Sequence, residues 1–384
     1  MSRIAYTGAR IFDGELWWER SALVVDGERI EGIIAADSPT DAQRVSLGGG
    51  ILAPGFIDLQ VNGGGGAQFN LTPDVPTIST ICTAFAKFGT TACLPTFITD
   101  TPEKTAQAVA AGKAAAQQNI RGFMGLHLEG PHLSVARKGA HDPALIRPMD
   151  EADLVALVEA RQHLPNLLTT VAAETVTPNQ ITRLTEAGVI VSIGHSNASY
   201  AAVKAAAEAG ATMVTHLFNA QSQIGNREPG VVGAALDIGS LWAGLIADGI
   251  HVDAAAIGIA LRSKRGPGRV FLVTDAMSPT GTDVTSFELT GRTVYRKDGA
   301  LRLGDGTLAG ADLTMIDAIA YVHKTLGLPL EEALRMASRY PAEAIGAQHE
   351  RGTLAPRSRA DLVHLSDDLA MRRTIIGGVT VWAA

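Results

Sequence analysis

The chain has 384 residues, of which 46% are hydrophobic and 18% are charged. This length suits one large barrel plus a smaller unit, and the composition excludes an intrinsically disordered protein. The formal net charge of −7 and the lack of a basic patch or tail argue against a nucleic-acid-binding protein.

The cysteines and the N-terminus predict the compartment. Cys82 and Cys93 are the only cysteines and stand among apolar residues, so we expect buried thiols in a reducing compartment rather than disulfides or a thiolate metal site. The N-terminal residues lack the layout of a signal peptide. No apolar run reaches the roughly 20 residues that a bilayer requires. The sequence therefore predicts a soluble, cytoplasmic protein.

The first 50 or so residues are typical of short strands. Residues 4–12, 21–25 and 29–34 are rich in β-branched and aromatic side chains, and the dipeptides Asp13-Gly14 and Asp26-Gly27 separate them. Asp-Gly between such runs is typical of β-hairpins. We therefore expect the chain to begin with antiparallel strands.

From residue 51 onward, short apolar runs alternate with Ala-rich stretches. Eight runs predict strands, at residues 55–59, 90–95, 122–128, 167–172, 189–193, 211–215, 242–246 and 270–273. Helices are expected between them, among others at residues 102–118, 151–161, 178–187 and 200–209. Eight such units predict a (β/α)₈ TIM-like barrel, with a doubly wound open sheet as the structural alternative.

The pattern becomes irregular after Asp275. Residues 293–303 predict a hairpin that turns at Lys297-Asp298-Gly299, and helices are expected at residues 313–326, 330–338 and 341–345. The tail returns to strand character and resembles the first segment in composition. We therefore expect three divisions: residues 1–53 and 351–384 form one small β-sandwich domain, and residues 54–350 form the metal-dependent barrel between them.

Four predicted barrel strands are followed by a carboxylate or an imidazole. These residues are Glu129, His195, His216 and Asp275. The carboxyl ends of parallel barrel strands meet at one face, where active sites of this fold lie, so these side chains should converge. This placement also favours the barrel over the open sheet. A single histidine at a strand end is often only a hydrogen-bonded polar residue, but four such residues in order predict a site.

Their chemistry predicts a metal centre. Glu129, His195 and His216 offer one oxygen and two nitrogens, which leaves a coordination position open for water, as catalytic zinc requires. Water bound there has a pKa of about 7 and serves as a hydroxide nucleophile. Asp275 is then the base that accepts the proton of this water and passes it to the leaving group.

The segment Pro54-Gly55-Phe56-Ile57-Asp58 resembles the opening of the barrel in the amidohydrolase superfamily. That family usually continues with His-x-His, which binds a second metal, whereas this chain has Gln60-Val61-Asn62. Neutral amides are weak metal ligands, so one divalent ion per subunit is expected. Zinc is expected, with Fe²⁺, Mn²⁺ or Co²⁺ as alternatives, because the donor set accepts all four.

A longer series of motifs resembles the N-acetylglucosamine-6-phosphate deacetylases, in order and over nearly the whole chain. The more discriminating motifs are His127-Leu128-Glu129-Gly130-Pro131 and Arg227-Glu228-Pro229-Gly230. The others are Gln60-Val61-Asn62-Gly63, Lys138-Gly139-Ala140-His141, Gly194-His195-Ser196, Thr215-His216-Leu217-Phe218-Asn219-Ala220, Asp248-Gly249-Ile250-His251 and Thr274-Asp275-Ala276.

The resemblance implies a role for each matching residue. Glu129, His195 and His216 would bind the metal, Asp275 would be the general base and acid, and His141 would polarise the acetyl carbonyl. Contacts with the sugar and its phosphate would come from Ala140, Asn219, Ala220, Arg227 and His251. Arg227 would reach the site of a second subunit, which implies a homodimer. The resemblance assigns no role to His132 or Asp312.

The implied reaction is hydrolysis of the acetamide of N-acetylglucosamine 6-phosphate to glucosamine 6-phosphate and acetate. Two alternatives stay open. Another amidohydrolase, such as a D-aminoacylase-like enzyme or a cyclic-amide hydrolase, would need no phosphate contacts. A non-catalytic barrel scaffold would have no need for Glu129, His195, His216 and Asp275 together.

Overall fold

A computed structural model describes residues 3–384 and contains an eight-stranded parallel sheet. The strands follow one another in chain order from β8 to β17 and form a nearly closed barrel, so the predicted (β/α)₈ fold is confirmed. They are β8 (Phe56–Val61), β11 (Thr90–Ile98), β12 (Leu126–Glu129), β13 (Leu167–Val171), β14 (Ile190–Ile193), β15 (Met213–Val214), β16 (Trp242–Leu245) and β17 (Val270–Leu272).

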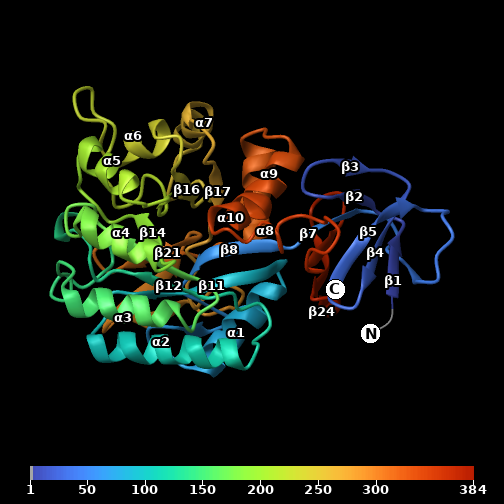
Figure 1. Ribbon diagram of the computed structural model, residues 1–384, viewed down its shortest axis with the longest axis horizontal. Helices are drawn as coiled ribbons and strands as arrows, with labels where there is room; N and C mark the ends of the chain where they lie inside the picture. Colours follow the sequence, from blue (N-terminus) through green and yellow to red (C-terminus); the bar gives the residue numbers. More distant parts are fainter. Residues whose placement is uncertain (1–2) are drawn as a thin grey trace.

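Helices surround this sheet and bury its outer face (Figure 1). In chain order they are α1 (Val75–Ala86), α2 (Pro102–Gln117), α3 (Glu151–Arg161), α4 (Pro178–Glu186), α5 (Tyr200–Glu208), α6 (Gly230–Asp237), α7 (Ala254–Ser263), α8 (Met315–Ala320), α9 (Leu330–Ala337) and α10 (Arg339–Ala344). A short 3₁₀ helix, η1 (Val135–Arg137), follows β12, and one π-helical turn, η2 (Tyr321–Thr325), continues α8. No helix among residues 3–384 is long and apolar enough to cross a membrane.

The core lies between strands and helices. Both faces of β8 and β11 are buried, as expected for strands enclosed by helices. Large side chains such as Phe56, Phe85 and Phe271 fill this layer at exposures of 1% or less. Cys82 and Cys93 lie in it as free thiols with their Sγ atoms 3.7 Å apart, so the prediction that both are buried is confirmed.

A second domain combines strands from both parts of the chain. One sheet has the order β5-β4-β1-β6 and the other the order β24-β23-β22-β7-β2-β3. In Figure 1 the early strands are blue and the late strands red, side by side at the right of the barrel. The strands are β1 (Arg3–Thr7), β2 (Arg10–Phe12), β3 (Trp17–Trp18), β4 (Ser21–Asp26), β5 (Arg29–Ala35), β6 (Gln43–Ser46), β7 (Ile51–Pro54), β22 (Leu362–Leu365), β23 (Met371–Ile376) and β24 (Val379–Ala383). The predicted small β-domain is thus confirmed.

An additional antiparallel sheet follows the last barrel strand. It consists of β18 (Ser286–Leu289), β19 (Arg292–Lys297), β20 (Ala300–Leu303) and β21 (Leu308–Ala311). The expected hairpin is present as β19 and β20, and both of its loop residues have positive φ, 52° at Asp298 and 76° at Gly299. Two such residues give the hairpin turn whose twist matches the strands. We call β18–β21 the inserted sheet. A second short hairpin, β9 (Gly63–Gly64) with β10 (Ala67–Gln68), follows β8.

The barrel closes where the segment after β17 meets β8. The backbone of Asp275 donates to the carbonyl of Gln60 at 2.9 Å, and that of Asn62 donates to the carbonyl of Ala276 at 2.8 Å. Asp58 strengthens the closure, because its carboxylate accepts from the backbone N–H of Gln60 and from both the N–H and the hydroxyl of Thr274. Burial raises the pKa of Asp58 to about 7.

We predict that Asp58→Ala lowers the free energy of unfolding by about 3 kcal/mol, because it leaves three buried donors without an acceptor. Asp58→Asn retains an acceptor oxygen and should lose about 1 kcal/mol. Urea unfolding monitored by circular dichroism measures both values. Equal losses in the two variants would contradict a hydrogen-bonding role for Asp58.

Candidate active site

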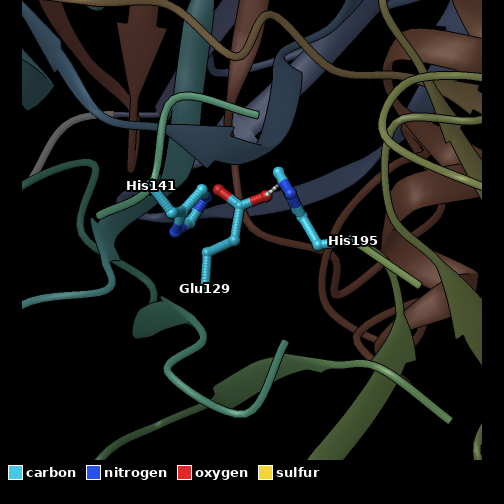
Figure 2. Close-up of side chains that lie close together, drawn as sticks. All are labelled: Glu129, His141 and His195. Carbon is cyan, nitrogen blue, oxygen red and sulfur yellow. Dashed lines mark hydrogen bonds and ion pairs between the residues drawn. The ribbon is translucent and has the colours of Figure 1, made fainter. Parts of the chain in front are cut away.

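Three side chains from the ends of three barrel strands converge at one point. Glu129 ends β12, His195 follows β14 and His216 follows β15. The Nε2 atoms of His195 and His216 lie 3.1 and 3.0 Å from Oε1 of Glu129 and 3.1 Å from each other. All three residues are at most 5% exposed. Figure 2 shows the His195 ring pointing at the Glu129 carboxylate.

The backbone at these positions is unusual. His195, His216 and Asp275 have φ angles of 46°, 28° and 51°. Residues other than glycine seldom occupy this region of backbone conformation. Such conformations cost on the order of 1–3 kcal/mol each and are concentrated at functional sites. Each of these residues comes just after its barrel strand, where the left-handed turn directs the side chain over the mouth of the barrel.

The three donors fit a divalent metal ion. A tetrahedral zinc site with bonds of about 2.0–2.1 Å separates its ligand atoms by roughly 3.3 Å, close to the 3.0–3.1 Å observed. Nδ1 of His195 bonds the carbonyl oxygen of Arg137 at 2.8 Å. That bond requires the proton on Nδ1, so the lone pair of Nε2 faces the site.

His141 is a fourth donor beside this group. Glu129, His141 and His195 each place one ligand atom within 4.8 Å of the others, and Figure 2 shows His141 on the opposite side of the carboxylate from His195. Its Nδ1 lies 2.8 Å from the hydroxyl of Thr99. Burial lowers the pKa of His141 well below its usual value, so its imidazole is neutral and has one N–H to donate.

Asp275 faces the same group and is held by two amides. Its Oδ1 accepts hydrogen bonds from Asn62 Nδ2 at 2.6 Å and from Gln60 Nε2 at 3.1 Å. Burial, followed by the nearby charge of Glu129, raises the pKa of Asp275 to about 6. Gln60 also lies 3.3 Å from both oxygens of Glu129. Gln60 and Asn62 thus orient carboxylates at the positions where other amidohydrolases were expected to have metal-binding histidines.

A cavity of about 370 Å³ opens above these residues. The expected substrate contacts Ala140, Asn219, Ala220 and His251 line it, as do Glu129, His141, His195, His216 and Asp275. Nδ1 of His251 bonds Asp248 at 2.6 Å. Arg227 is the exception: it is exposed on the turn at residues 225–228 and does not line the cavity of its own chain.

Two residues without an expected role lie outside this cavity. His132 is buried toward α3, where Nδ1 contacts the carbonyl of Arg147 and Nε2 lies 3.8 Å from Asp153. These residues line a second cavity of about 420 Å³ between α2 and α3, in which His132, Arg147 and Asp153 pair with one another. Asp312 accepts from Nε of Arg296 at 2.6 Å and so fixes the inserted sheet.

The sequence interpretation missed several residues of the site. Thr99 directly follows β11, so the rule that barrel strand ends carry functional groups would have found it. Met277, Arg302, Thr307 and Leu308 also line the cavity. No local signal marks Arg302, because it belongs to a hairpin that folds back over the barrel. A core of Leu301, Leu303, Val294, Met277 and Ile98, with Ala140 against it, holds that hairpin in place.

Comparison with known proteins identifies the class. Residues 51–381 match the sequence profile described as "Amidohydrolase family". The chain belongs to the amidohydrolase family.

Three relatives resemble the chain over nearly its whole length. An N-acetylgalactosamine-6-phosphate deacetylase from Shewanella sp. (strain ANA-3) is 42% identical over 98% of this chain and 95% of its own. The crystal structure of N-acetylglucosamine-6-phosphate deacetylase from Pasteurella multocida is 38% identical, with a TM-score of 0.95 and full coverage of both chains. The corresponding Mycobacterium smegmatis enzyme, solved as an aspartate-to-alanine mutant in complex with N-acetyl-D-glucosamine-6-phosphate, is 31% identical, with a TM-score of 0.92, covering 99% of this chain and 100% of its own.

We predict that Glu129→Gln and His195→Asn each weaken binding of one zinc ion per chain by more than about 100-fold. Loss of a direct ligand should weaken metal binding by more than the 10–100-fold that is typical when a residue hydrogen-bonded to a ligand is replaced. Competition with a chromophoric chelator, with metal content by mass spectrometry, measures the affinity. His364→Asn removes an imidazole from β22 in the small domain and serves as the control. Unchanged affinity in both site variants would contradict the metal centre.

Proposed function

We propose that the protein hydrolyses the acetamide of N-acetylglucosamine 6-phosphate, giving glucosamine 6-phosphate and acetate. The observation that carries the proposal is the convergence of Glu129, His195 and His216 beside Asp275 at the floor of a cavity of about 370 Å³. The 38% identical Pasteurella multocida enzyme, with its full coverage, supports this substrate.

Metal binding and proton transfer are assigned to different residues. Glu129, His195 and His216 would hold one divalent ion, most simply zinc, which when bound acidifies water and polarises a carbonyl. Asp275 would take the proton of the attacking water and deliver it to the amine as the C–N bond breaks. Its pKa of about 6 suits both transfers near neutral pH, and Asn62 and Gln60 keep its carboxylate directed at the floor.

His141 would stabilise the developing oxyanion of the acetyl group. Nδ1 of His141 would accept from the Thr99 hydroxyl, so that Nε2 of the neutral ring would carry its one N–H, and preorganised donors of this kind act where negative charge develops in the transition state. Ala140, Asn219, Ala220 and His251 would contact the sugar and its phosphate, since they line the cavity above the floor. These contacts orient the acetamide without taking part in bond breaking.

A second candidate substrate is N-acetylgalactosamine 6-phosphate. The observation that favours it is the 42% identity to the Shewanella deacetylase named for that sugar. The two sugars differ only in the configuration at C4, remote from the acetamide, so the chemistry at the floor would be the same. A D-aminoacylase-like or cyclic-amide hydrolase activity would need no phosphate, whereas the relatives described above are deacetylases of phosphorylated amino sugars.

We predict that the zinc-loaded protein releases acetate rapidly from N-acetylglucosamine 6-phosphate, slowly from N-acetylglucosamine, and not at all after metal removal. Asp275→Asn should lower kcat by about 10²–10⁴-fold, the usual contribution of a general acid–base group. A coupled acetate assay measures all rates, with N-acetylgalactosamine 6-phosphate run in parallel to rank the two epimers. Asp283→Asn, which neutralises an exposed carboxylate outside the cavity, is the matched control. Equal rates on the two forms of N-acetylglucosamine would refute the phosphate requirement.

We further propose that the protein acts as a homodimer in which Arg227 completes the cavity of the partner subunit. Arg227 is exposed and outside the cavity of its own chain, and a guanidinium can bind phosphate oxygens in a bidentate manner.

Mixing inactive variants tests this arrangement. Arg227→Met and Asp275→Asn subunits, each nearly inactive alone, should recover about a quarter of the wild-type activity after random reassociation. Half of the dimers are then mixed, and one of the two sites in each mixed dimer has both residues. The activity of the unfolded-and-refolded mixture is compared with that of each variant treated alone. No recovery, despite mixed dimers seen by native mass spectrometry, would place Arg227 elsewhere.

A further inference from the structure

The cavity has an unbalanced charge for a phosphorylated substrate. A phosphate monoester carries nearly two negative charges at neutral pH, because its second pKa is about 6. Glu129 and Asp275 at the floor carry two more when ionised, and one bound divalent ion would balance these two. His251 is already paired with Asp248. The floor and this wall therefore offer no net positive charge to the phosphate.

Arg302 is the one Lys or Arg among residues 3–384 that lines this cavity. It lies on β20, between Leu301 and Leu303, whose buried side chains anchor the strand in the core beneath the inserted sheet. Because side chains alternate along a strand, Arg302 lies on the other face of the sheet from this core, opposite Leu308 of β21, which also lines the cavity. The turn between β20 and β21 is held as well, since Nη1 of Arg302 donates to the carbonyl of Gly306 at 3.0 Å.

The other arginines of the inserted sheet are engaged by the protein itself. Arg296 forms an ion pair with Asp312 and donates to the carbonyl of Thr282. Arg292 donates to the carbonyl of Ala140. Arg302, in contrast, has no carboxylate partner within the described part of the chain, although it is exposed to the cavity. A guanidinium with free N–H groups on a rigid strand is suited to an anionic ligand.

We propose that Arg302 binds the phosphate group of the substrate from within the same chain and makes the cavity selective for phosphorylated sugars. The inference rests on the proposed function and deepens it. It differs from the proposed contribution of Arg227, because Arg302 needs no second subunit. The two guanidinium groups would then approach the phosphate from different chains.

The test is steady-state kinetics of Arg302→Gln on N-acetylglucosamine 6-phosphate and on N-acetylglucosamine. KM for the phosphorylated sugar should rise about tenfold or more, as expected for loss of one charge-assisted contact, while kcat stays within about threefold. The kcat/KM on the unphosphorylated sugar should change by less than about twofold. Arg302→Lys should restore part of the loss, because it keeps the charge but not the planar fork.

Lys297→Gln is the matched control, since it removes an exposed positive charge from the same hairpin outside the cavity. A second measurement uses inorganic phosphate as a competitive inhibitor: its inhibition constant should rise in Arg302→Gln and not in Lys297→Gln. Equal losses on both sugars, or an unchanged KM and inhibition constant, would overturn the proposal for Arg302. Failure of the wild-type protein to release acetate from any phosphorylated sugar would instead overturn the proposed function.

Discussion

The convergence of two imidazole nitrogens on one carboxylate oxygen is the constraint on which the site depends. The Nε2 atoms of His195 and His216 and Oε1 of Glu129 lie 3.0–3.1 Å from one another, and all three residues are buried. Bringing charged and polar groups out of water costs several kcal/mol per ion unless they are paired or bind a metal. The left-handed backbone at both histidines adds to that cost. The rigid barrel therefore supplies the stability that holds these donors together.

The surroundings shift the pKa values of the two carboxylates at the cavity floor, Glu129 and Asp275, in opposite directions. Burial alone would raise the pKa of Glu129, but the adjacent imidazoles of His195 and His216 lower it well below the usual value. The pKa of Asp275 rises to about 6 because burial and the charge of Glu129 outweigh its amide donors. A permanently ionised carboxylate suits a ligand, and one that titrates near neutrality suits proton transfer. Gln60, which bonds both, keeps them apart without adding charge.

The sequence predicted the fold class and much of the site, because the fold class follows from the alternation of apolar runs with helical stretches and the site from polar residues placed just after the predicted strands. Eight apolar runs gave the barrel, and the residues just after four of them gave Glu129, His195, His216 and Asp275. What stayed hidden depends on contacts between distant segments. The orienting bonds of Gln60 and the placement of Arg302 need the closed barrel and the folded inserted sheet. The positive φ angles at His195 and His216 could not be inferred, because histidine adopts them more often than most residues but still only uncommonly.

The pairing of β7 with β22 has a consequence for biosynthesis. Leu52 of β7 faces His364 of β22, so the two strands are separated by about 300 residues of intervening chain. On the ribosome, where roughly 5–20 residues are added per second, the sheet order β5-β4-β1-β6 can form early. The edge of β7 that pairs with β22 meanwhile stays unpaired until the barrel and β22 have been translated. An unpaired apolar edge of this kind is a site for aggregation or chaperone binding, so the nascent chain is most vulnerable during synthesis of its own catalytic domain.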